Sequence, residues 1–315
     1  RLIGVRFRLT SGSVGAQIPA KPLATGGKIK RIGHMRLLLP TLLTMVAFAA
    51  NSVLNRYAVD AGYAEPGSFA AIRVLSGAVV LIALVRAQGR RIPPLMAVQR
   101  LIGAGTLALY MIGFSLAYLT LDAGLGALIL FGVVQITMFA AAYTTGVPPT
   151  PRRTLGAVIA FGGLIVVLGP SGGGGGGFTG AAAMAAAGVG WGFYTLAGRK
   201  EADPLAATAA NFLLALPPVL AALVLFGNVS TLALAGVVLA VLSGAVTSGL
   251  GYALWYSLLP RLEPSFAAVI QLSVPVIAVA GGVVLLGETV GLRFVFGAVL
   301  VLGGIGLALT TGRRV

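Results

Sequence analysis

A few polar side chains interrupt the long apolar stretches of this sequence, and they have the chemistry to bind a ligand. Arg73 carries a guanidinium, which can hold a carboxylate or another anionic group through two parallel hydrogen bonds. It could instead bond backbone carbonyls or extend toward the end of its segment. The other candidates are amides, which either contact a ligand or tie helices together: Asn51, Gln135, Asn211 and Gln271.

Aromatic and proline side chains in the same stretches form a second set of candidates. Aromatic rings near the middle of an apolar stretch either line a cavity for an apolar or aromatic group or pack between helices. The candidates for such a cavity are Tyr110, Trp191, Tyr194 and Tyr252. Prolines within a helix remove backbone hydrogen bonds and can serve as bends during gating, and these are Pro217, Pro218 and Pro275.

The residues needed for catalysis or metal binding are scarce. The chain has no cysteine and one histidine, His34, which lies in a basic N-terminal segment. Every acidic residue falls in an expected loop or at the end of an apolar stretch: Asp60, Glu65, Asp122, Glu201, Asp203, Glu263 and Glu288. We therefore expect no enzyme, no metal site and no cofactor. Without a carboxylate deep in an apolar stretch, we also expect no obligatory proton exchange and no preference for cations.

Composition indicates the elements that position these residues. Of 315 residues, 58% are hydrophobic and 9% are charged, and the mean hydropathy is +1.00. Apolar runs of about 18 residues or more are typical of membrane-spanning helices. The sequence predicts an all-α integral membrane protein with ten transmembrane helices, near 37–57, 67–86, 100–120, 123–143, 153–169, 179–198, 204–226, 232–258, 265–286 and 292–311.

The placement of the basic residues predicts an orientation. The net charge is +15, and the N-terminal tail with alternate loops holds 19 of the 22 lysines and arginines. Cytoplasmic loops carry such an excess, so both termini are expected in the cytoplasm of a bacterial-type inner membrane. The bilayer's anionic lipid accounts for basic loops, so we expect no nucleic-acid partner.

The sequence also repeats itself. The stretch "GAVIAFGGL" at 156–164 and the stretch "GAVLVLGGI" at 297–305 lie 141 positions apart, and the same shift pairs Arg152 with Arg293. Each half then holds five spans, an odd number, so the second half must be inverted relative to the first. Inverted repeats place a substrate site near the bilayer midplane, between the halves. We expect the glycines in these repeats to allow close packing of helices.

The repeat defines the expected domains. Residues 1–34 are expected to be a disordered basic cytoplasmic tail, with Met35 a natural first residue. Residues 35–170 form the first five-helix repeat and residues 179–315 the second, inverted one. Between them, residues 171–178 form a glycine-rich outer loop, in which no Lys-Ser or Lys-Thr follows the glycines as a phosphate-binding loop would require.

Two segments resemble a known family. The stretch "GYALWYSLLPRLEPSFAAVIQLSVPVIAVAGGVVLLGETV" at 251–290 is similar to the second repeat of EamA-type transporters, in the drug/metabolite transporter superfamily. The stretches "FAANSVLNRY" and "PGSFAAIRVLSG" within 48–77 are similar to the first repeat. The resemblance covers residues 36–311 and implies ten helices around a central cavity that opens alternately to each side. Within the family, size and pattern resemble the YddG-type amino-acid exporters.

These observations lead to a functional expectation. We expect an exporter of small zwitterionic or neutral metabolites, amino acids with aromatic or apolar side chains among them, working by alternating access. A transporter of other metabolites or drugs, and a membrane scaffold or receptor without transport, remain the alternatives. The expected partners are a small-molecule substrate and the lipid bilayer, and the expected assembly is a monomer, with a homodimer as the alternative.

Overall fold

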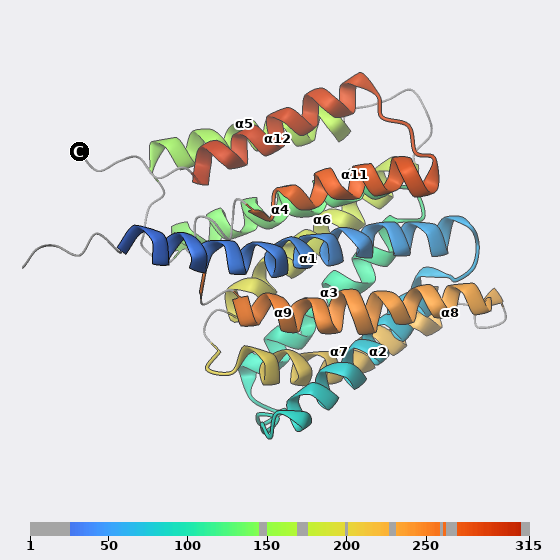
Figure 1. Cartoon of the computed structure of the whole chain (residues 1–315). Helices are drawn as coiled ribbons and strands as arrows, with labels where there is room; N and C mark the ends of the chain where they lie inside the picture. The colour runs from blue at the N-terminus through green and yellow to red at the C-terminus, as the bar shows by residue number, and fades with distance from the viewer. Residues whose placement is uncertain are drawn as a thin grey trace, which may run out of the picture. The chain divides into compact units, whose positions relative to one another are not determined.

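The computed structural model is helical throughout its described residues, with short turns between the helices (Figure 1). The structure describes residues 26–144, 150–168, 176–198, 201–226, 231–258, 261–262 and 270–309. Residues 39–315 form one compact unit, and residues 1–38 form another. The first of these units contains the functional candidates, and the description below concerns it.

The helices of the first half follow the expected spans closely. They are α1 (Gly26–Asp60), α2 (Pro66–Ala87), α3 (Val98–Ala117), α4 (Ala123–Thr144) and α5 (Pro151–Leu168). Because α1 begins at Gly26, residues 26–34 are helical, although the sequence analysis assigned them to a disordered tail. The start of α2 follows a local rule, since Pro66 occupies the first helical position, where its missing N–H is not needed.

The second half has the same order of helices with one difference in its middle. It comprises α6 (Gly176–Gly198), α7 (Pro204–Phe226), α8 (Leu234–Val241), the π-helix η2 (Leu242–Leu250), α9 (Gly251–Leu258), α11 (Ser273–Leu286) and α12 (Leu292–Leu309). The expected span 232–258 is therefore a helix with a π-helical centre. Most of the expected glycine-rich outer loop and the start of the expected span 265–286 lie outside the described residues.

Length and apolar composition mark five of the described helices as candidate membrane spans. These are Leu37–Asp60, Pro66–Ala87, Val98–Ala117, Pro204–Phe226 and Leu234–Leu258. Shorter apolar helices cover Ala123–Met138, Thr154–Val166, Ser273–Leu286 and Leu292–Ala308. The protein is thus an all-helical membrane protein. Helices suit this environment because they satisfy the backbone hydrogen bonds that lipid cannot.

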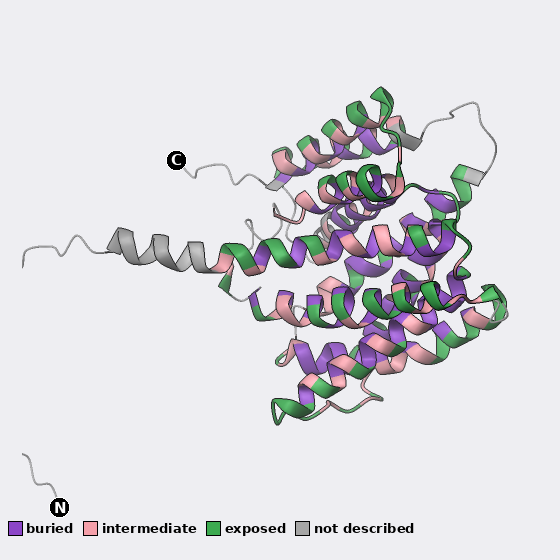
Figure 2. Cartoon of the chain, turned by 45° about the vertical axis from the view of Figure 1, so that its right-hand side comes forward, coloured by how far each residue is buried: buried purple, intermediate pink, exposed green. Residues whose placement is uncertain are grey.

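Large apolar side chains remain exposed along many of the helices, as Figure 2 shows by the exposed stretches on their surfaces. Val79, Val224 and Leu285 are examples, each more than half exposed. A water-soluble protein rarely leaves so many apolar side chains uncovered. Lipid contact accounts for them.

Helices at equivalent places in the two halves pack against each other: α2 on α7, α4 on α11 and α5 on α12. The pair α5 and α12 lies side by side in Figure 1. Gly156 leaves no room for a side chain against the Gly304 carbonyl, and a Cβ built on Gly163 would lie 2.8 Å from the Gly297 carbonyl oxygen. From Gly156 to Gly163 the residue number rises along α5, while the number of the glycine contacted on α12 falls from 304 to 297. The two helices are therefore antiparallel.

These glycine contacts are exchanged by the sequence repeat. A shift of 141 residues carries Gly156 onto Gly297 and Gly163 onto Gly304, so it converts one contact into the other. The expectation of close packing is confirmed for these four glycines. It is wrong for Gly162 and Gly303 of the same stretches, which have open space beside them.

Candidate functional site

Arg73 is completely buried, about two turns or 10 Å along α2 from its start. Its Nε donates a hydrogen bond to the Ser248 hydroxyl at 3.1 Å, and its Nη2 donates to the Tyr110 hydroxyl at 3.0 Å. The guanidinium carbon lies 4.8 Å from the centroid of the Phe114 ring and 5.4 Å from that of Tyr110. The side chain is therefore held by hydroxyls and aromatic faces, which rules out a simple extension to the interface.

The Arg73 charge has no counter-charge among the described residues. Neither an aspartate nor a glutamate forms an ion pair with it in that part of the chain, and its Nη1 has no hydrogen-bond partner there. A buried charge without a counter-ion is strongly unfavourable unless the site is completed by something else. A guanidinium with a free nitrogen is suited to receive an anionic group such as a carboxylate.

Asn51 holds the neighbouring part of the second half in place. Its Oδ1 accepts hydrogen bonds from Ser243 at 2.7 Å, Thr247 at 2.6 Å and, more weakly, Ser248 at 3.4 Å. Its Nδ2 donates to the Ala47 carbonyl at 3.3 Å. Through these hydrogen bonds Asn51 fixes the position of η2. Ser248 of η2 also accepts the hydrogen bond from the Arg73 Nε, so the same contacts help to orient Arg73.

The π-helix explains how one segment presents three hydroxyls to α1 and α2. Ser243, Thr247 and Ser248 are buried residues of η2. π-helical segments are uncommon and occur often at functional sites. Gly244 lies so close to α2 that a side chain there would meet the Arg73 carbonyl oxygen. The segment therefore packs its backbone directly against the turn of α2 that carries Arg73.

Asn211 and Arg73 lie at the same distance from the start of their helices, since setting Pro204 of α7 on Pro66 of α2 places one on the other. Asn211 packs against Gly103 of α3, where an added Cβ would lie 2.7 Å from the Asn211 Nδ2. The shift of 141 residues pairs Gly103 with Gly244, which packs against the Arg73 carbonyl oxygen. Each half therefore places a glycine against this turn of the helix, and the polar side chain there is an amide in α7 and a guanidinium in α2.

A small cavity lies beside Arg73, between aromatic rings from five helices, α1, α3, α4, α6 and α9. Its volume is about 10 Å³, counted as the space open to the centre of a water molecule, which is room for about one water. Its walls are formed by Phe48, Asn51, Ser52, Tyr110, Phe114, Leu130, Phe131, Trp191 and Tyr252. The ring of Trp191 lies 4.9 Å from that of Tyr110 and 5.1 Å from that of Tyr252, centroid to centroid. The site is closed around its centre in this structure.

The structure brings some predicted residues together and leaves others apart. Arg73, Asn51, Tyr110, Trp191 and Tyr252 meet at or beside the cavity. The Tyr194 hydroxyl donates instead to Thr208 at 3.3 Å, although its ring lies 5.5 Å from that of Trp191.

Gln135, Gln271 and the prolines do not line the cavity. Gln135 is buried in α4 and Gln271 is partly exposed just before α11, and neither lines the cavity. Pro217 and Pro218 lie exposed inside α7, which continues through them, and Pro275 lies in the first turn of α11, where proline is tolerated. Whether these prolines bend during gating stays a prediction.

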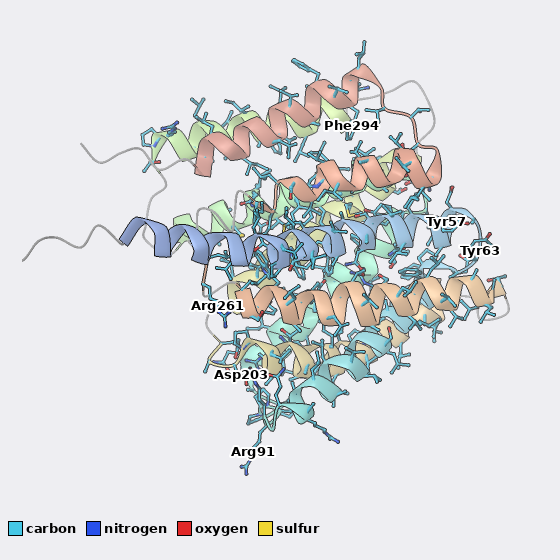
Figure 3. All side chains as sticks on the ribbon, in the orientation of Figure 1. Tyr57, Tyr63, Arg91, Asp203, Arg261 and Phe294 are labelled. Carbon is cyan, nitrogen blue, oxygen red and sulfur yellow. The ribbon has the colours of Figure 1, made fainter. Side chains whose placement is uncertain are left out.

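Charged groups gather near the end of α1, where Figure 3 labels Tyr57 and Tyr63. Arg56 pairs with Asp60, one helical turn further along α1, at 3.0 Å, and also approaches Asp122 at 3.8 Å and Glu288 at 4.0 Å. The Glu288 carboxylate accepts a hydrogen bond from the Ala123 N–H at 2.7 Å, at the start of α4. Burial raises the pKa of Glu288 above its ordinary value, and the nearby Asp122 acts in the same direction, while the Ala123 N–H and Arg56 oppose the shift.

A second set of charges lies at the opposite end, where Figure 3 labels Arg91 and Asp203. Arg90 pairs with Asp203 at 2.9 Å, and Arg100 pairs with Glu201. Both pairs join the first half of the chain to the segment before α7. Charge pairs therefore link the helices at both ends, and Arg73 with the residues around the cavity lies between these two sets of pairs.

Some contributors to the site were missed from the sequence. The η2 hydroxyls and Phe48 were not singled out, because small hydroxyl residues and phenylalanine are ordinary in membrane helices. The signal available for η2 was the run "LSGAVTSGL", with three hydroxyls among small residues. In the described residues, no group of three or more His, Cys, Asp or Glu side chains is placed to hold a metal ion.

Comparisons with known proteins agree with this architecture. A solved crystal structure of a protein superposes with a TM-score of 0.64 at 19% identity, over 89% of this chain and 99% of that one, so the two share a fold. A Pseudomonas aeruginosa protein, described as uncharacterized protein PA1977, is 44% identical over 274 residues, which is 87% of this chain and 94% of its own. The EamA-like transporter family matches twice, at residues 35–169 and 178–310. The chain therefore belongs to the EamA-like transporter family, a group of membrane transporters in the drug/metabolite transporter superfamily.

Proposed function

We propose that this protein exports small zwitterionic or neutral metabolites, amino acids with aromatic or apolar side chains among them, by alternating access. The substrate lies between two inverted five-helix repeats of a ten-span protein. The observation that carries the proposal is the buried Arg73, whose charge has no counter-charge and whose Nη1 has no partner in the described part of the chain. A substrate carboxylate supplies the missing anion.

The aromatic surroundings of Arg73 support a substrate with an apolar or aromatic side chain. Tyr110, Trp191 and Tyr252 offer ring faces within one cluster, and Phe48 packs edge-on against the last two at 6.3 and 5.7 Å. Aromatic pairs favour such tilted and edge-to-face arrangements. When a planar substrate side chain enters between these rings, contacts between the rings and the substrate replace contacts between one ring and another. Little packing is lost in this exchange.

Alternating access requires that either end of the helices can open while the other stays closed. The charge pairs Arg56–Glu288 at one end, and Arg90–Asp203 and Arg100–Glu201 at the other, are the contacts that must separate in turn. A cavity with room for about one water, between two fastened ends, corresponds to an occluded state. Substrate entry must widen this cavity, which is the conformational change that alternating access describes.

The inverted repeat is supported by the antiparallel pair α5 and α12, whose glycine contacts the sequence shift exchanges. The positive-inside asymmetry supports a cytoplasmic location for both termini, in a bacterial-type inner membrane. An impermeant thiol reagent applied to intact cells should then label Ala61→Cys and leave Gln88→Cys unlabelled. The cysteine-free sequence makes both variants clean probes, and the reverse labelling pattern would invert the proposed orientation.

The decisive experiment is flux of radiolabelled phenylalanine through purified protein in sealed vesicles, corrected for protein-free vesicles. We expect Arg73→Lys to lower flux about tenfold and Arg73→Ala about a hundredfold, because charge-assisted hydrogen bonds contribute about 1.5–3 kcal/mol. Arg91→Ala, which removes an exposed arginine, serves as the control. A folded Arg73→Ala protein with full flux would assign Arg73 a structural role, and absence of flux for any metabolite would favour a scaffold or receptor.

A further inference from the structure

Asn55 has a buried polar atom that the protein leaves unpaired. The side chain is completely buried in α1, and its Nδ2 donates a hydrogen bond to the Ser115 hydroxyl of α3 at 2.9 Å. Its Oδ1 has no hydrogen-bond partner among the described residues. A buried acceptor without a donor is unfavourable by the full cost of its desolvation, so native proteins rarely retain one without a reason.

The side chains of Asn55 and Arg73 contact neighbouring residues of α3. Ser115 accepts a hydrogen bond from the Asn55 Nδ2, and the preceding residue, Phe114, has its ring centroid 4.8 Å from the Arg73 guanidinium carbon. Asn55 is also one helical turn from Asn51, which is linked through Ser248 to the Arg73 Nε. Asn51 and Phe114, one from each of these two chains of contact, line the cavity.

We propose that Asn55 determines specificity by accepting a hydrogen bond from the amino group of a substrate whose carboxylate is bound by Arg73. The inference rests on the proposed function and extends it. An unpaired cationic donor and an unpaired neutral acceptor, linked by these two chains of contact, are the complement of an α-amino acid, which carries a carboxylate and an ammonium on the same carbon. An amide oxygen suits the ammonium because it accepts the bond without adding a charge that would neutralise Arg73.

The first test uses the wild-type protein and two substrates that differ in the amino group. Phenylalanine has it and 3-phenylpropanoate lacks it, while both share the ring and the carboxylate. We expect phenylalanine to show a flux per unit concentration about tenfold higher in vesicles held at zero membrane potential, because a hydrogen bond to a charged group is among the stronger kinds. Equal flux of the two substrates would overturn the proposal without any variant.

The second test shifts the same ratio in opposite directions. Asn55→Leu removes the acceptor at similar volume and should bring the ratio of phenylalanine to 3-phenylpropanoate flux to about one. Asn55→Asp makes the acceptor anionic and should raise the ratio above that of the wild type. Thr44→Val, an isosteric change at another buried position of α1, is the matched control and should leave the ratio unchanged.

The outcomes separate the inference from the function on which it rests. If both substrates move, depend on Arg73 and keep the same ratio in the Asn55 variants, the proposed function stands and the inference is wrong. A water bound in the cavity, or helix packing, would then account for the buried Asn55 Oδ1. If Asn55→Leu lowers both fluxes by the same factor, the amide donates to the carboxylate that the two substrates share, which also overturns the inference. If neither substrate moves, the proposed function itself fails.

Discussion

Two arginines one helix apart show how differently this chain treats a positive charge. Arg56 lies near the end of α1 with three carboxylates within 4.0 Å, and its Nη1 also donates to the Tyr118 carbonyl at 3.0 Å. Arg73 lies deeper, fully buried, and has hydroxyls and rings in place of carboxylates among the described residues. A charge that the protein itself neutralises is satisfied within the fold, whereas the charge without a counter-ion is the one to which we assign substrate binding.

The sharpest way to break this comparison is to remove the Arg73 charge while keeping its bulk. Arg73→Met should lower phenylalanine flux about a hundredfold, because the charge-assisted bonds to the carboxylate are lost. Its melting temperature should equal or exceed that of the wild type, because an uncompensated buried charge destabilises the fold. Thermal unfolding and vesicle flux measured on one preparation check both parts. A strong loss of stability with retained flux would show that Arg73 has a structural role, like Arg56.

The reverse is expected of Arg56. Arg56→Met leaves Asp60, Asp122 and Glu288 without their shared counter-charge, so it should destabilise the protein by about 1–2 kcal/mol. For the fraction that remains folded, the substrate concentration that gives half-maximal flux should change less than twofold, because Arg56 is proposed to act in opening this end and not in binding substrate. The same thermal unfolding measurement tests this, with flux normalised to folded protein. An unchanged melting temperature would show that the network at this end contributes little.

Ser248→Ala should have a smaller effect that separates orientation from charge. It removes the acceptor for the Arg73 Nε and the hydroxyl that links η2 to Asn51, while the charge remains. Loss of one such bond predicts about a fivefold rise in the concentration of substrate that gives half-maximal flux. The maximal rate should change little, and Ser248→Thr should restore the wild-type value. A fall in maximal rate alone would contradict a positioning role.

The smallest expected effect concerns pH at the carboxylate-rich end. Burial raises the pKa of Glu288 above its ordinary value of 4.5, so the folded protein binds this proton more tightly than the unfolded chain does. The free energy of unfolding should therefore increase as pH falls through the raised pKa toward 4.5, because Glu288 becomes protonated in the folded protein first. Above the raised pKa, Glu288 is ionised in the folded protein, and the full cost of burying its charge lowers the free energy of unfolding. Glu288→Gln should remove this component, visible as a smaller gain in melting temperature between pH 7 and pH 5.

The sequence alone predicted much of the arrangement of helices along the chain, because the length of an apolar run and the repetition of a stretch can be read directly from the residues. The expected spans 67–86, 123–143 and 204–226 agree with α2, α4 and α7 within a residue at each end. The acids were expected at loops and helix ends, and this is confirmed for those in the described residues; Glu263 lies outside them. The same reasoning could not find the π-helix, since nothing in a run of small residues distinguishes a π from an α turn.

The site was predicted less completely, because its members come from distant parts of the chain. Arg73 and Asn51 stood out as polar residues in apolar runs, but the absence of a carboxylate near Arg73 depends on how the helices pack. Arg56 illustrates the same limit, since a spacing of four residues favours the pair with Asp60 but carries no information on Asp122 or Glu288. Tyr194, Gln135 and Gln271 were plausible by residue type, but none of them lines the cavity, and the Tyr194 hydroxyl donates to Thr208.

The glycine contacts between α5 and α12 have a consequence for assembly. In the vocabulary of oligomers, they form an isologous interface within a single polypeptide, because each side presents the same sequence to the other. Such a surface is self-complementary by symmetry. A chain that carried a single copy of this helix surface would need no new surface to pair with a second, antiparallel copy of itself, and the present chain holds both partners, α5 and α12, in one molecule.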